Sequence, residues 1–132
     1  MSNAIKTLLL AAMLSMSSVV ASAGPFEDAN AAYERQDYAT ALKLWRPLAD
    51  QGDASSQYNL AVMNEKGQGV EKDYLQAHIW YDIALKYFPL TAIAERNQAA
   101  KARARMVKKM TAAQIAKALK LAREWKPSTG PK

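Results

Sequence analysis

The chain has 132 residues, no cysteine and a formal net charge of +6. Without cysteine it has no disulfide, no thiol nucleophile and no thiolate metal site, so its stability must come from apolar packing. The charge is divided along the chain. Residues 24–95 hold six basic and eleven acidic residues, a net charge of −5, whereas residues 96–132 hold eleven basic residues and one acid, a net charge of +10.

The first 23 residues are typical of an export signal. Lys6 supplies a positive charge before the apolar stretch 7–20, and Ala21-Ser22-Ala23 is a small-residue cleavage site. The apolar stretch is shorter than the ~20 residues of a membrane-spanning helix, which favours a cleaved signal peptide over a retained anchor. We therefore expect a periplasmic or secreted protein, with a single domain at 24–126 and a flexible tail at 127–132.

The periodicity of the mature chain is helical throughout. Apolar residues recur at helical spacing from Phe26 onward, and no stretch alternates for long enough to predict a strand. Two helices are expected before Gly52, with Asp37 as the N-cap of the second. Asp53 can cap a third helix, and a fourth ends before Pro89.

A motif repeats within these helices. The stretch DYATALKLW (37–45) is matched 36 residues later by DYLQAHIWY (73–81). The second copy carries five extra residues, 68–72, in the link between the two helices of one hairpin. A phosphate-binding loop would need a preceding strand and a following Lys-Ser/Thr pair, so Gly67 and Gly69 predict a turn instead.

Residues 58–84 resemble a Sel1-like repeat, and residues 26–53 resemble its shorter relative, the tetratricopeptide repeat. The resemblance rests on the signature residues Gly67, Gly69, Asp73, Ala77, Trp80, Tyr81 and Ala84. It implies an all-α, right-handed α-solenoid fragment of helix-turn-helix hairpins with a C-terminal capping hairpin. Small side chains at Ala77 and Ala84 would let a facing helix approach closely.

The resemblance also implies a binding surface, because the first helix of each repeat lines the concave face of the solenoid. The positions expected to face outward there are Glu34, Arg35, Tyr58, Val62, Glu65 and Lys66. They combine both charges with an aromatic and an aliphatic side chain, which is typical of a groove for a peptide or protein partner.

The only histidine, His78, is a candidate for chemistry because Asp82 follows it by four residues on the same helical face. A zinc site would need a third ligand, and a triad would need a nucleophile motif. The face of His78 lies opposite Ala77 and Tyr81, so we expect it to be solvated. The sequence therefore predicts no catalytic residue, no metal site and no cofactor.

The last third predicts a third hairpin. A helix at 90–107 would bury Ile93, Ala100, Ala104 and Val107. Thr111 and Gln114 form a capping box for a final helix. That helix would bury Ile115, Leu119, Ala122 and Trp125 and close the open end of the solenoid.

Lys101, Arg105, Lys108 and Lys109 form a basic patch on this hairpin. The patch is either a solvated surface or a contact for an acidic partner, an anionic lipid or an envelope polymer. No aromatic residue interleaves these cations, so nucleic acid is not expected.

The leading functional prediction is an exported, non-enzymatic interaction module. Two alternatives remain: an electrostatic anchor through the basic hairpin, and an envelope enzyme or accessory related to β-lactams or peptidoglycan. The resemblance implies the second alternative because relatives of this repeat class have been linked to β-lactams, although those relatives are rich in cysteine.

Overall fold

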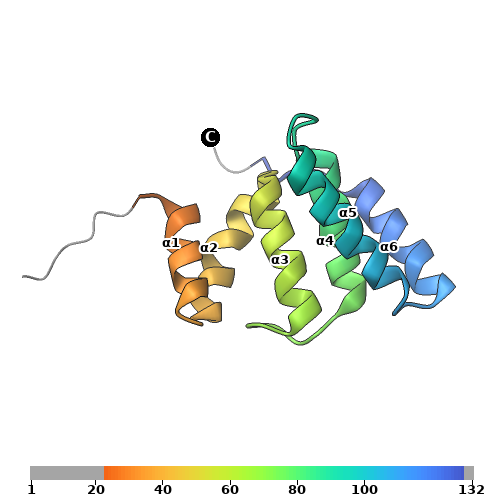
Figure 1. The fold of residues 1–132 in the computed structure, drawn as a ribbon, viewed down its shortest axis with the longest axis horizontal. Coiled ribbons are helices and arrows are strands. Elements are labelled where there is room, and N and C mark those ends of the chain that lie inside the picture. The colour runs from red at the N-terminus through yellow and green to blue at the C-terminus, as the bar shows by residue number, and fades with distance from the viewer. Residues whose placement is uncertain (1–22, 130–132) are drawn as a thin grey trace, which may run out of the picture.

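A computed structural model describes residues 23–129, which form six helices and no strand (Figure 1). The helices are α1 (Pro25–Glu34), α2 (Tyr38–Asp50), α3 (Ala54–Lys66), α4 (Tyr74–Tyr87), α5 (Ile93–Val107) and α6 (Ala112–Glu124). The prediction of an all-α chain of helical hairpins is confirmed. The predicted signal peptide falls on residues 1–22, outside the described residues, and on Ala23. Within 23–129, no helix is long and apolar enough to cross a membrane.

Side-chain caps fix where four of the helices begin. Asp37, Asp53 and Asp73 each accept a hydrogen bond from the backbone N–H three residues later. Thr111 and Gln114 form the reciprocal capping box that the sequence predicts. These caps satisfy N–H groups that have no partner inside the helix.

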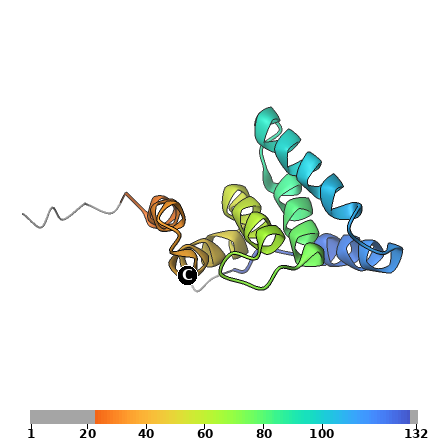
Figure 2. The same cartoon turned by 60° about the horizontal axis from the view of Figure 1, so that its bottom comes forward.

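The helices follow one another along the long axis of the molecule, from α1 at one end to α6 at the other (Figure 1). Each of the first four packs against the next, but α6 packs mainly against α4 rather than against α5 (Figure 2). Helix α4 is consequently surrounded by α3, α5 and α6. The last two helices cover α4 from two sides.

The core runs through the middle of this arrangement. Trp45 of α2, Leu60 and Met63 of α3, and Tyr81 and Ile83 of α4 are all buried. Ala77 and Ala84 are fully buried, as the predicted seam of small residues requires.

His78 corrects one prediction. Its side chain is only 1% exposed, not solvated. The prediction of a solvated face fails because α4 has neighbours on three sides and is buried almost all the way round.

The predicted buried stripe of α5 is largely wrong, whereas that of α6 is wrong only at Leu119, since Ile115 and Trp125 are partly buried and Ala122 is buried. Ile93 is 67% exposed and Val107 39% exposed, while the buried residues of α5 are Ala99, Ala102 and Met106. In α6, Ala118 and Ala122 are buried, and Leu119 is 40% exposed. Helix α5 also begins at Ile93, three residues after the predicted start at Leu90, which is 83% exposed in the preceding turn.

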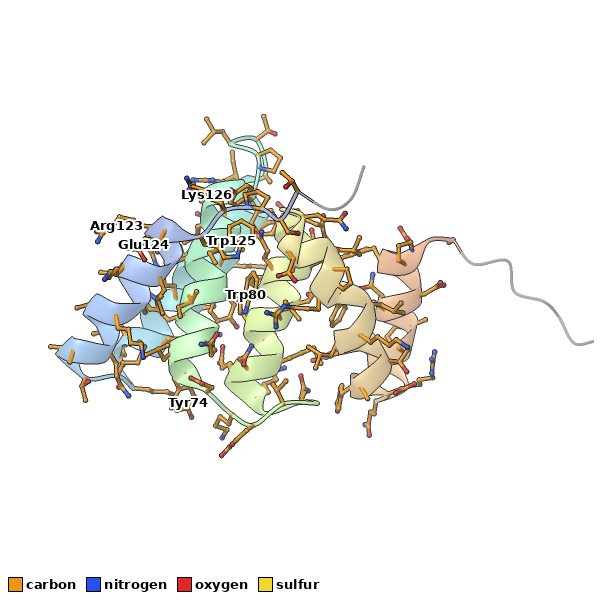
Figure 3. All side chains as sticks on the ribbon, turned by 180° about the vertical axis from the view of Figure 1, so that it is seen from behind. Tyr74, Trp80, Arg123, Glu124, Trp125 and Lys126 are labelled. Carbon is orange, nitrogen blue, oxygen red and sulfur yellow. The ribbon has the colours of Figure 1, made fainter. Side chains whose placement is uncertain are left out.

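The chain beyond α6 turns back across the molecule. Trp125 makes edge contacts with Trp80 and Tyr87, at centroid distances of 6.1 and 5.2 Å (Figure 3). The Ser128 N–H then donates to the Asp50 carbonyl at 2.7 Å. The predicted flexible tail therefore does not begin at residue 127, since Ser128 is held at the end of α2. We call residues 125–128 the return segment.

Candidate functional site

The signature residues of the repeat hold the α3–α4 link in place. Gly67 ends α3 in the left-handed conformation, with φ 69°. A Cβ at Gly69, whose φ is 70°, would lie 3.1 Å from the Tyr38 carbonyl oxygen, so the link passes closely over the start of α2. Between the two glycines, the Gln68 side chain accepts from the Tyr33 hydroxyl at 2.8 Å. This link therefore joins the two hairpins, and its residues line neither of the two cavities described below.

The remaining signature residues pack α4. The Tyr81 hydroxyl donates to Glu65 of α3 at 2.7 Å. The Arg46 guanidinium lies 5.6 Å from the centroid of the Trp80 ring, and the same ring also contacts Trp125. Asp73 caps the helix, and the two alanines lie in the core.

A groove opens on the other side of the molecule, between α1 and α3. Its first cavity has a volume of about 290 Å³. Asn30, Tyr33 and Glu34 of α1 line one wall. The opposite wall comes from Tyr58, Asn59 and Val62 of α3. Helix α2 contributes one lining residue, Trp45.

A second cavity of about 280 Å³ continues the groove toward α5. It shares Asn30, Tyr58 and Asn59 with the first cavity, so the two form one groove. Phe26, Ser55, Phe88, Glu95 and Gln98 complete its lining.

The packing of the helices explains why this groove exists. Helix α1 packs against α2 and makes few contacts with α3. Side chains of α1 and α3 therefore face each other across open space. The groove runs along the first helices of the hairpins, α1, α3 and α5, the surface that the sequence resemblance predicts for a partner.

The structure places the six predicted groove residues in two groups. Three of them, Glu34, Tyr58 and Val62, line the first cavity. The other three, Arg35, Glu65 and Lys66, line neither cavity: Arg35 forms an ion pair with Asp37 at 3.5 Å, and Lys66 is exposed at the end of α3.

Glu65 is engaged inside the fold. It accepts the Tyr81 hydroxyl and also pairs with Arg105 of α5 at 3.0 Å. Burial, followed by the hydrogen bond to Glu65, raises the pKa of Tyr81 well above its usual range, so its hydroxyl stays protonated. The separate hydrogen bond that Arg105 donates to Glu65 raises the pKa of Arg105. Glu65 thus links α3, α4 and α5.

Asn30 and Asn59 are groove residues that the sequence prediction missed. Both lie where the two cavities meet. Neither side-chain amide hydrogen-bonds to another described residue. An asparagine in mid-helix carries no pattern of its own, so only the three-dimensional arrangement of α1 and α3 singles these two out.

The four residues of the predicted basic patch also differ in their surroundings. Arg105 pairs with Glu65. The Lys109 ammonium lies 5.1 Å from the centroid of the Tyr74 ring. Lys101 and Lys108 are exposed. Whether these cations contact a partner stays a prediction.

His78 and Asp82 do not form the hydrogen-bonded pair that their spacing allows. Asp82 pairs with Arg103 of α5, and the His78 Nδ1 atom is buried without a hydrogen-bond partner. Burial lowers the pKa of His78 below its usual 6.5. Among residues 23–129, no group of three His, Cys, Asp or Glu side chains is placed to hold a metal ion.

Comparison with protein families finds two matches to the Sel1 repeat, at residues 29–53 and 54–86. They correspond to the α1–α2 and α3–α4 hairpins, so the first hairpin, whose sequence resembles a tetratricopeptide repeat, matches the Sel1 repeat as well. Comparison with curated proteins and with solved structures gave no match.

Proposed function

Because this chain belongs to the Sel1-like repeat proteins, we propose that it is an exported, non-enzymatic module that binds a peptide segment of a protein partner in the groove between α1, α3 and α5. Sel1 repeats generally mediate protein–protein interaction. The observation that carries the choice of surface is the pair of joined cavities. They meet at Tyr58, an aromatic side chain that is only partly buried.

The groove suits side chains rather than a drug-sized ligand. Small-molecule pockets usually enclose ~300–1,000 Å³ in one space. Here the space is divided into two cavities of about 290 and 280 Å³ along a helix. An extended segment that places one side chain in each cavity fits this division.

The proposal is tested by selecting binding peptides from a displayed random library and measuring their affinity by fluorescence anisotropy. Tyr58→Ala combined with Val62→Ala should weaken binding by about 30-fold, the effect of a ~2 kcal/mol hot spot. Tyr74→Ala, which removes a half-buried tyrosine outside the groove, is the matched control and should bind as the wild type does. Selection of no peptide, or equal losses in both variants, would exclude the groove.

Export is the second part of the proposal, and it rests on the Lys6, apolar and Ala21-Ser22-Ala23 pattern. Mass spectrometry of the protein purified from a periplasmic fraction should give a chain that begins at Gly24. An intact chain confined to the cytoplasm would contradict export and would not affect the proposal that the groove binds peptides.

The non-enzymatic part is supported by the surroundings of the only histidine. A general base must reach the proton that it abstracts. His78 is 1% exposed and lines neither cavity. Purified protein is expected to leave a chromogenic β-lactam intact, and turnover that His78→Gln abolishes would establish the enzyme alternative.

A further inference from the structure

The charges of the groove differ from those of the chain. The sequence has 18 basic and 12 acidic residues. Yet the two cavities contain the carboxylates of Glu34 and Glu95 and no basic side chain. Neither carboxylate forms an ion pair with a described residue, unlike Glu65 and Asp82, which pair with arginines of α5.

Each cavity places one of these carboxylates beside aromatic rings. In the first cavity, Glu34 accompanies Tyr33 and Trp45. In the second, Glu95 accompanies Phe26 and Phe88. Lysine and arginine side chains have an apolar stem and a charged end, and their cations are also attracted to aromatic faces. A wall of aromatic rings with one unpaired carboxylate matches such a side chain.

The junction of the cavities matches a peptide backbone. Asn30 and Asn59 present unpaired amides on either side of the groove, and each amide can both donate and accept a hydrogen bond. A peptide group needs both kinds of partner. Tyr58, which lines both cavities, offers an aromatic ring to the segment.

The length of the groove sets the spacing of the cations. The lining residues of α1 extend from Phe26 to Glu34, about 12 Å along the helix axis at ~1.5 Å per residue. In a polyproline II chain, which rises ~3.1 Å per residue with three residues per turn, side chains three residues apart lie on one face about 9 Å apart, close to this length.

Building on the proposed function, we infer that the groove recognises an extended basic peptide with two lysine or arginine residues separated by about two others, one cation in each cavity. Glu34 and Glu95 select the charge. Asn30 and Asn59 hold the backbone.

The test uses acetylated and amidated synthetic peptides that contain Lys-x-x-Lys, with matched Gln-x-x-Gln and Glu-x-x-Glu versions and one version with adjacent lysines. The wild-type protein should prefer Lys-x-x-Lys over all three. Glu34→Gln and Glu95→Gln should each lower the affinity for Lys-x-x-Lys about threefold, and the double variant should lower it about tenfold. These losses are expected for ion pairs open to solvent. The loss should shrink as salt increases.

Matched controls separate this inference from the proposed function. Glu27→Gln removes an exposed carboxylate of α1 outside the cavities and should leave the preference unchanged. Thermal melting of each variant checks its fold. If all peptides bind equally well and Tyr58→Ala weakens all of them, the groove binds peptides and the charge inference is wrong.

The other outcomes are also distinct. A preference for lysine that survives in the Glu34→Gln, Glu95→Gln double variant would place the recognition outside the groove and overturn the inference. A preference for Glu-x-x-Glu that Lys108→Glu and Lys109→Glu abolish would assign binding to the basic patch instead. Binding of none of the peptides, together with an empty library selection, would overturn the proposed function as well.

Discussion

Single side chains connect the helices of this protein at a few points, and Glu65 is the clearest. Its carboxylate accepts the Tyr81 hydroxyl from α4 and the Arg105 guanidinium from α5. Its side chain is only 20% exposed. A carboxylate in this position is stabilised by charge-assisted hydrogen bonds that water can compete for only partly. Glu65 therefore serves the fold, whereas Glu34 and Glu95 form no ion pair with a described residue.

His78 makes the stability of the fold depend on pH. Because burial lowers its pKa below 6.5 in the folded state, the unfolded chain binds a proton first as the pH falls. Stability is complete above pH 6.5 and decreases as the pH falls from 6.5 toward the folded-state pKa. Over the first pH unit this loss is at most about 1.4 kcal/mol.

Thermal melting at pH 7.5 and pH 5.5 measures this effect, since the chain contains no other histidine. The melting temperature of the wild type should be lower at pH 5.5 than at pH 7.5. The corresponding decrease for His78→Gln or His78→Leu should be smaller. Parallel decreases in all three proteins would show that His78 is not the group responsible.

At the scale of elements, α4 determines how the hairpins fit together. It is the helix that α3, α5 and α6 all contact, and Ala77 and Ala84 are completely buried within these contacts. Small side chains there permit short distances between helix axes. Larger side chains cannot be accommodated without moving a neighbouring helix.

Ala77→Leu should therefore destabilise the protein by about 1–3 kcal/mol through overpacking. Ala39→Leu, at an exposed position of α2, is the matched control and should change the stability by less than ~0.5 kcal/mol. Urea unfolding followed by circular dichroism measures both. An unchanged midpoint for Ala77→Leu would mean that this seam is loosely packed.

The helix starts could be predicted from sequence because capping is local. The three predicted caps, Asp37, Asp53 and Thr111, each accept a hydrogen bond from a backbone N–H only three residues away. The rotation of α5 could not be predicted, because alanines occur on several of its faces and small side chains give little contrast. The burial of His78 depends on the packing of α4 against α3, α5 and α6, which no local pattern in α4 records.

The groove likewise combines residues that the sequence predicts with residues that only the packing of the helices identifies. Glu34, Tyr58 and Val62 were predicted from the repeat resemblance, which fixes which helices are concave. Asn30, Asn59 and Glu95 were missed, because their importance comes from the open space between α1 and α3 and from the approach of α5. The separation of α1 from α3 and the position of α5 depend on packing between helices far apart in sequence.

At the scale of the whole molecule, the return segment connects the two ends of the fold. Trp125 packs against Trp80 of α4 (Figure 3) and against Tyr87. The Ser128 N–H donates to the Asp50 carbonyl at the end of α2. Repeat proteins usually have contacts only between neighbouring repeats. Here the last residues of the domain contact its first hairpin directly.

Trp125→Ala should lower the free energy of unfolding by about 2–3 kcal/mol, somewhat less than for a fully buried tryptophan, because Trp125 is only partly buried. Lys126→Ala, at the next and exposed position, should have almost no effect. Chemical denaturation of the two variants makes the comparison, and similar stabilities would show that the return segment does not contribute.

The bond between Ser128 and Asp50 also has a consequence for the order of folding. It joins residues 78 positions apart, so it closes a loop that includes most of the domain. Closing so long a loop is slow compared with forming a hairpin from neighbouring helices. On the ribosome, the first hairpin emerges long before its distant partner exists, and its last contacts can form only when residue 128 has also emerged. The domain is therefore expected to gain its full stability only after the return segment has left the ribosome.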